Sequence, residues 1–169
     1  MVDPRDTKLA DILVNYSIEM KKDENVCLLT DSTQTLPLFL EVYKKIIIGG
    51  GYPYPHIFLD PHIGSEGMDY TFMKHASEEQ LKHLSPLRLK EMQAMDSYIR
   101  IGGPTNKQEL SGIDPQRISL RRKATKPIMD ERLRKKWVVT RYPTPSMAQA
   151  AGMSTQDFTD FFYNACLID

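Results

Sequence analysis

Apolar residues in the first half of the chain alternate between helical stripes and short continuous runs. The first stripe, for which Asp6 is the predicted cap, consists of Leu9, Ile12, Leu13, Tyr16 and Met20. Residues 26–30 form a continuous apolar run, which is typical of a strand buried on both faces. Pro37 suits the first turn of a second helix and residues 49–51, three glycines, suit its end. The stripe between them consists of Phe39, Val42, Tyr43, Ile46 and Ile47.

A second apolar run, at residues 56–60, predicts another buried strand. The order helix, strand, helix, strand makes the second helix a crossover between parallel strands, and such crossovers are right-handed by default. Residues 61–73 have mixed polarity and include two glycines, so we predict irregular structure there.

The second half of the chain contains further helices with clear start signals and two more predicted strands, at residues 96–101 and 137–140. Ser77 begins a capping box and Pro86 opens another helical segment. Asp114 precedes a long basic helix that Pro127 should interrupt or kink. Together the elements predict a single α/β domain over residues 1–169. We expect a mostly parallel sheet of about four strands flanked by helices, in Rossmann- or flavodoxin-like layers.

The last stretch of the chain, residues 137–169, is dense in structural signals. Pro145 opens a short helix that Gly152 ends, and Ser154 with Asp157 forms a variant capping box for the final helix. Met153 and Phe158 are placed as a hydrophobic staple around that cap. The apolar face predicted for the final helix consists of Phe158, Phe161, Phe162, Ala165 and Cys166.

Composition narrows the possible function classes only a little. The chain has 22 basic and 22 acidic residues, so overall charge favours neither nucleic acid nor an anionic membrane as a partner. No apolar run approaches the roughly 20 residues of a membrane span, and the N-terminus lacks an apolar signal core. We interpret Cys27 and Cys166 as buried thiols in a reducing compartment and expect a cytoplasmic protein.

Imidazole and carboxylate groups that could hold zinc or manganese gather around the second predicted strand. They are His56, Asp60, His62, Glu66, Asp69 and His75. His56 and Asp60 should share a strand face, and the loop after a parallel strand is where α/β sites usually lie. However, the spacing matches no metal signature, and we do not assign a metal or catalytic role to the set.

The glycine clusters do not predict a nucleotide site. Residues 49–51 follow a helix, the reverse of a phosphate-binding loop, and Gly102–Gly103 are followed by Pro104, which lacks an amide donor.

The most basic segment of the chain could contact nucleic acid or form a solvated helix face. Its cations are Arg117, Arg121, Arg122, Lys123, Lys126, Arg132, Arg134, Lys135 and Lys136. No aromatic residues interleave with them to stack on bases, so we favour a solvated or partner-facing surface.

The closing motif resembles the thermophilic metallo-aminopeptidase family (aminopeptidase T-like). The motif reads Trp137-Val-Val-Thr-x-Tyr-Pro-Thr-Pro-x-Met-Ala-Gln-x-Ala-Gly-Met-Ser, followed by Asp157-Phe158, Phe161-Phe162 and Ala165-Cys166. Upstream, the opening helix, the strand at 26–30, the helix that ends at Gly51 and the segment 110–115 resemble that family's N-terminal region in order and spacing. The resemblance covers nearly the whole chain.

The resemblance implies a two-domain, dimeric exopeptidase in which two divalent metal ions, zinc or cobalt, activate water against the peptide bond. The family's metal ligands lie in the second domain, beyond Asp169. We therefore expect no catalytic, cofactor-binding or metal-binding residue in this chain, which counts against His56, Asp60 and His62 as ligands. The final helix has no stop signal, so we expect the chain to be the N-terminal domain of a longer aminopeptidase and inactive alone. Peptide substrate would bind through the missing C-terminal domain, and nucleic acid and membrane are not expected partners.

Two other functions remain open. One is a stand-alone binding module that uses residues 117–136 for nucleic acid or an acidic partner. The other is a small independent hydrolase built on the loop after His56.

Overall fold

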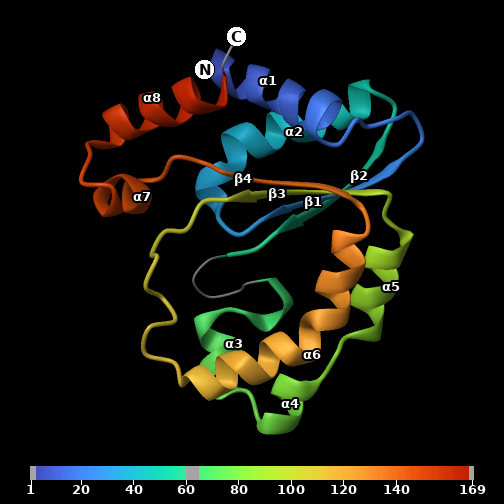
Figure 1. The fold of residues 1–169 in the computed structure, drawn as a ribbon, viewed down its shortest axis with the longest axis vertical. Coiled ribbons are helices and arrows are strands. Elements are labelled where there is room, and N and C mark those ends of the chain that lie inside the picture. The colour runs from blue at the N-terminus through green and yellow to red at the C-terminus, as the bar shows by residue number, and fades with distance from the viewer. Residues whose placement is uncertain (1–2, 60–64, 168–169) are drawn as a thin grey trace.

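The computed structural model describes residues 3–59 and 65–167, which fold around one parallel sheet. Its four strands are β1 (Asn25–Thr30), β2 (Tyr52–Ile57), β3 (Ser97–Gly102) and β4 (Lys136–Arg141). They lie in the order β2-β1-β3-β4, and every neighbouring pair is parallel (Figure 1). The predicted α/β fold is confirmed.

Two helical layers cover the sheet, one on each face (Figure 1). One layer contains α1 (Pro4–Asp11), its π-helical continuation Ile12–Ser17, α2 (Leu36–Ile48) and α8 (Thr155–Cys166). The other contains α3 (Tyr70–His75), α4 (Glu78–Lys82), α5 (Pro86–Ala94) and α6 (Pro115–Leu133). The short helix α7 (Pro145–Ala150) contacts α8, and two 3-10 turns span Thr33–Thr35 and Ser65–Gly67. We call the two layers the α1/α2/α8 layer and the α5/α6 layer.

The capping signals read from the sequence are confirmed at five helices. Ser77 and Gln80 form the capping box of α4, and Asp114 caps α6 through the amide of Gln116. Ser154 accepts from the Asp157 amide and donates to its carboxylate. Gly50, at the end of α2, and Gly152, after α7, have left-handed φ values of 78° and 67°, which glycine adopts without strain.

The prediction that Asp6 caps the first helix is wrong. Asp3 is the cap, and its carboxylate accepts from the Arg5 amide at 2.9 Å. Asp6 is instead fully buried, and its Oδ1 accepts a hydrogen bond from the Tyr163 hydroxyl at 2.5 Å. Burial raises the pKa of the Asp6 carboxyl, and burial together with that carboxylate raises the pKa of Tyr163. This pair joins the two ends of the described chain, which lie side by side in Figure 1.

The second strand begins four residues earlier than predicted and lies at an edge. Tyr52 and Phe58 donate their amides to Glu24 and Thr30 of the β1 side, at 2.8 and 3.0 Å. The alternation of a strand therefore turns the prolines Pro53 and Pro55 away from β1, where no ladder bond is lost. The strand β2 pairs with β1 at the edge of the sheet, and most of its side chains are exposed. This contradicts the predicted burial. Asp60, the predicted end, lies outside the described residues.

Several apolar positions assigned to buried faces are solvent-exposed. Tyr16 is 80% exposed, Phe161 60% and Ile47 50%, because each lies at the margin of its helix's apolar face. In the segment predicted to be irregular, α3 begins at Tyr70, capped by Asp69. The helix α6 continues across Pro127 without interruption, and Figure 1 shows it bending along its course, as an internal proline favours.

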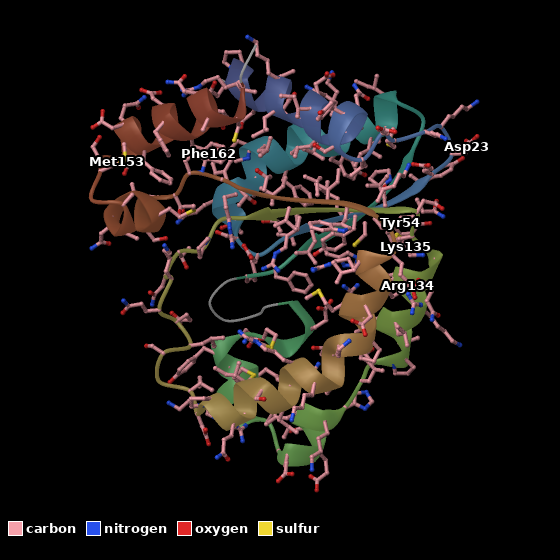
Figure 2. All side chains as sticks on the ribbon, in the orientation of Figure 1. Asp23, Tyr54, Arg134, Lys135, Met153 and Phe162 are labelled. Atoms are coloured by element: carbon pink, nitrogen blue, oxygen red, sulfur yellow. The ribbon has the colours of Figure 1, made fainter. Side chains whose placement is uncertain are left out.

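The core divides between the two faces of the sheet. Under the α1/α2/α8 layer, a continuous apolar cluster joins Val26, Leu28, Ile99 and Ile101 of the sheet to the helices. Phe162 of α8, labelled in Figure 2, packs against this cluster. Under the α5/α6 layer, a smaller cluster contains Cys27, Leu29, Met92, Met95, Tyr98 and Ile128. Cys27 is buried and Cys166 half-buried, and both are free thiols.

Candidate functional site

The metal-like set of side chains is not gathered into one site by the fold. His56 lies on β2 and is half-buried, while Asp69 is used as the cap of α3 and accepts from the Phe72 amide at 2.9 Å. His75 is exposed at the end of α3. Asp60 and His62 lie outside the described residues. Among residues 3–59 and 65–167, no three histidine, cysteine, aspartate or glutamate side chains form a group that could hold a metal ion.

His56 and Glu66 do come together, but around an arginine. Arg88 pairs with Glu91 and lies 3.3 Å from Glu66, so its guanidinium bridges the two carboxylates. The Nε2 atom of His56 is 2.7 Å from Glu91 Oε1 and 3.3 Å from Arg88 Nη1. Burial first, and the charge of Arg88 second, lower the pKa of His56, although Glu91 opposes this. Because Arg88 already neutralises both carboxylates, this donor set does not fit a two-metal centre.

A crevice of about 540 Å³ opens at the carboxyl ends of the central strands β1 and β3. The strand β2 lies on one side of β1, and β3 lies on the other. The strand order therefore reverses between β1 and β3. Ligands of open parallel sheets bind at such a switch point. The polar side chains that line it include Asp31 after β1, Tyr98 and Arg100 on β3, and Arg122, Lys126 and Arg132 on α6. We call this the switch-point crevice.

Asp31 and Arg100 form the floor of the crevice. Arg100 Nη2 donates to Asp31 Oδ2 at 2.6 Å, and the Gly103 amide donates to Asp31 Oδ1 at 3.0 Å. Burial disfavours the charged guanidinium, but the hydrogen bond and charge of Asp31 outweigh it and raise the pKa of Arg100. Arg100 therefore stays cationic, and both oxygens of Asp31 are occupied.

Arg132 forms the opposite side of the crevice. Its guanidinium carbon lies 5.0 Å from the centre of the Tyr98 ring, within cation–π distance. Burial raises the pKa of the Tyr98 phenol, although the charges of Arg100 and Arg132 oppose this. The Nε atoms of Arg100 and Arg132 are both buried, and neither has a hydrogen-bond partner among the described residues. The crevice is thus lined by two arginines, each of which has a buried Nε–H without a partner among the described residues.

Two arginines of the basic segment depart from the solvated or partner-facing surface that the sequence predicts. Arg121 is buried, and it donates to the backbone carbonyls of Glu66 at 2.7 Å and His83 at 2.6 Å. Arg117 donates in the same way to the carbonyls of Met73 and Ala76. Burial lowers the pKa of Arg121. Sequence reasoning missed this because the acceptors are backbone oxygens, which carry no sequence signal.

Most of the other cations in that segment are paired with acids. Lys126 pairs with Asp130, and Arg134 and Lys135 both lie 3.3 Å from Glu131. Lys136 contacts Glu24 at 2.7 Å. Arg122 and Lys123 are exposed. This distribution does not form the continuous basic stripe that a nucleic-acid surface requires.

Sequence reasoning missed the crevice residues Asp31, Tyr98 and Arg100. Two signals were available: Asp31 directly follows a buried strand, and Arg100 is a single charge inside an apolar run. Their proximity depends on β1 and β3 being neighbours, which the order of elements along the chain does not specify.

Residues 3–169 match the family model described as thermophilic metalloprotease (M29). Among solved structures, wild-type AmpT from Thermus thermophilus has a TM-score of 0.71 and 16% sequence identity. That alignment covers 96% of this chain and 42% of the AmpT chain, so this chain spans well under half of that protein's length. At this identity the likeness shows the fold alone.

A LacI-family transcription repressor from Corynebacterium glutamicum is also similar, with a TM-score of 0.38 and 12% identity over 95% of this chain and 52% of the repressor. A search of curated protein sequences finds no match.

Proposed function

Because the chain belongs to the thermophilic metalloprotease family (M29), we propose that it is the N-terminal domain of a longer, two-domain metallo-aminopeptidase. The full-length enzyme would remove residues from the N-termini of peptides. The observation that carries this proposal is the family match over residues 3–169, together with the resemblance of the closing motif to aminopeptidases. The coverage of 42% of AmpT is consistent with a chain that forms one part of such an enzyme.

The proposal assigns the chemistry to residues outside this chain. Peptide hydrolysis by a two-metal centre needs clustered carboxylate and imidazole ligands for zinc or cobalt. The described residues provide no such cluster, and the nearest approach to one, around His56, is occupied by Arg88. We therefore propose that this domain is inactive alone and supports or covers a C-terminal domain that holds the metals and the peptide.

For the full-length protein we propose a homodimer, which the family resemblance supports, and a cytoplasmic location, with which two free cysteines are compatible. Among the described residues, no helix combines the length and the apolar character that crossing a membrane requires.

The competing binding-module function is less well supported. It would use residues 117–136, but two of the cations in that segment bind backbone carbonyls and most of the others pair with acids. A module of this kind should bind a generic oligonucleotide with strong salt dependence.

An aminopeptidase assay tests the proposed division of labour. The 169-residue chain, incubated with cobalt or zinc, should not hydrolyse leucine p-nitroanilide, whereas AmpT prepared in parallel serves as the active reference. Metal-dependent turnover by the 169-residue chain would contradict the proposal. The coding sequence downstream of Asp169 gives an independent check, because it should encode clustered glutamates and histidines.

A further inference from the structure

The charges that line the switch-point crevice are not balanced. Its acids are already occupied: Asp31 accepts from Arg100 and Gly103, Asp69 accepts from the Phe72 amide, and Glu66 pairs with Arg88. Within the part of the chain that the structure describes, no carboxylate is bonded to Arg122 or Arg132. An incoming ligand would therefore meet cations rather than anions.

Two of the donors in the crevice are unused although they are buried. The Nε–H groups of Arg100 and Arg132 have lost water and gained no acceptor among the described residues. Leaving a buried donor of a charged group unpaired is costly, and native structures rarely retain one without a function. Both arginines line the crevice, so an acceptor that enters it would meet their guanidinium groups.

The position of the two arginines favours an acceptor with several oxygens. Arg100 and Tyr98 are two residues apart on β3, so their side chains lie on the same face of the sheet. Arg132 reaches the Tyr98 ring from α6. Guanidinium groups that approach from two sides match the planar or tetrahedral array of oxygens in a carboxylate or phosphate.

We propose that the switch-point crevice binds a ligand through an oxyanion, a carboxylate or phosphate group, held by Arg100 and Arg132 with Arg122 at the rim. The volume of about 540 Å³ is within the range of small-molecule sites and leaves room for more than the anion itself. Met68 and Met129 supply apolar wall for the rest of the ligand. This site is separate from the peptidase chemistry and does not depend on the proposed function.

Calorimetric titration of the 169-residue chain tests the proposal, with ionic strength held near 0.15 M so that general screening is constant. The probes are inorganic phosphate, the dipeptide Leu-Leu, and Leu-Leu amide, which lacks the carboxylate. Binding of phosphate alone identifies a free inorganic anion as the ligand class. Binding of Leu-Leu but not its amide identifies a carboxylate. Either result supports the proposal, and failure of every probe to bind at concentrations up to about 10 mM would overturn it.

Two crevice variants and one matched control distinguish a built site from general charge attraction. Arg132→Gln and Arg122→Gln should each weaken binding, the former by about tenfold or more, because a charged hydrogen bond is lost. Arg134→Gln is the control: its side chain is 75% exposed, it projects from the end of α6 near β4 (Figure 2), and it does not line the crevice. It should bind like the wild type.

Equal weakening in all three variants would show general attraction and overturn the proposal. Thermal unfolding of each variant checks that the fold is intact. If Arg132→Gln unfolds, Arg122→Gln decides the outcome, because Arg122 is exposed.

Discussion

The two faces of the sheet are stabilised by different kinds of interaction. The α1/α2/α8 layer rests on a continuous apolar cluster in which Leu28, Phe39 and Ile99 are almost completely buried. The α5/α6 layer has two smaller apolar clusters, of which the second contains Met73, Leu81 and Ile113. It is also held by arginines: Arg88 bridges two carboxylates, Arg121 binds backbone carbonyls, and Arg132 covers Tyr98. The first layer gives the domain its stability, whereas the second leaves a crevice with unused donors.

The largest effect should come from the apolar layer. Phe39→Ala removes a side chain that is 2% exposed and should lower the free energy of unfolding by about 3–5 kcal/mol. Denaturant unfolding followed by circular dichroism measures this. A loss below about 1 kcal/mol would mean that this cluster can collapse around the cavity and does not dominate stability.

A smaller and more local effect is expected in the arginine-held layer. Arg121→Met removes the donors for the carbonyls of Glu66 and His83 and should cost about 1–3 kcal/mol. Because those carbonyls lie in the segments that flank α3 and α4, hydrogen exchange should accelerate there before it does in β1. Uniform acceleration throughout the sheet would show instead that the two layers unfold as one unit.

The pH dependence of stability should reflect Asp6, a fully buried acid of the apolar layer. The folded pKa of Asp6 is raised above the usual value of 3.8, so the folded state binds more protons than the unfolded state above that pH. The stability that the Asp6 carboxyl contributes is fully present below its unfolded pKa, and it is lost as the pH rises through its folded pKa.

The variant Asp6→Asn should remove that loss, because the amide stays neutral while its oxygen can still accept from Tyr163. Unfolding measured between acidic and neutral pH should give a flatter profile than the wild type. An unchanged profile would mean that Asp6 does not titrate in this range.

The smallest effect is expected where a charge is at the surface. Arg134→Gln removes an exposed pair with Glu131 and should change stability by less than about 0.5 kcal/mol. Comparing the stability of Arg134→Gln with that of Arg121→Met separates the effect of losing a surface charge from the effect of losing buried hydrogen bonds. Similar costs for the two variants would contradict the distinction between a structural and a surface arginine.

Local signals in the sequence were sufficient for most elements and insufficient for the site. The apolar runs at β1, β3 and β4 and the caps Ser77, Asp114 and Ser154 identified their elements, because the physics involved is confined to a few neighbouring residues. The second strand was misplaced because prolines suggest a loop, and they are harmless only on the outer side of an edge strand.

The functions of Asp6, Arg121 and Arg100 could not be predicted from the sequence, since their partners are far away along the chain. Asp6 meets Tyr163, Arg121 meets backbone carbonyls, and Arg100 meets Asp31 across two neighbouring strands. Each contact depends on strand order and helix packing. The crevice therefore depends on β1 and β3 being neighbours in the sheet.

We propose that this domain provides the scaffold and that the metal centre lies in other residues of the protein. Equilibrium dialysis of the 169-residue chain against zinc or cobalt, with a weak chelator to suppress surface binding, tests this division. We expect the chain to retain no more metal than a His56→Ala, His75→Ala double variant. Tight retention of two ions per chain that is lost in that variant would contradict it, because it would place a metal centre among residues that Arg88 and the helix caps already occupy.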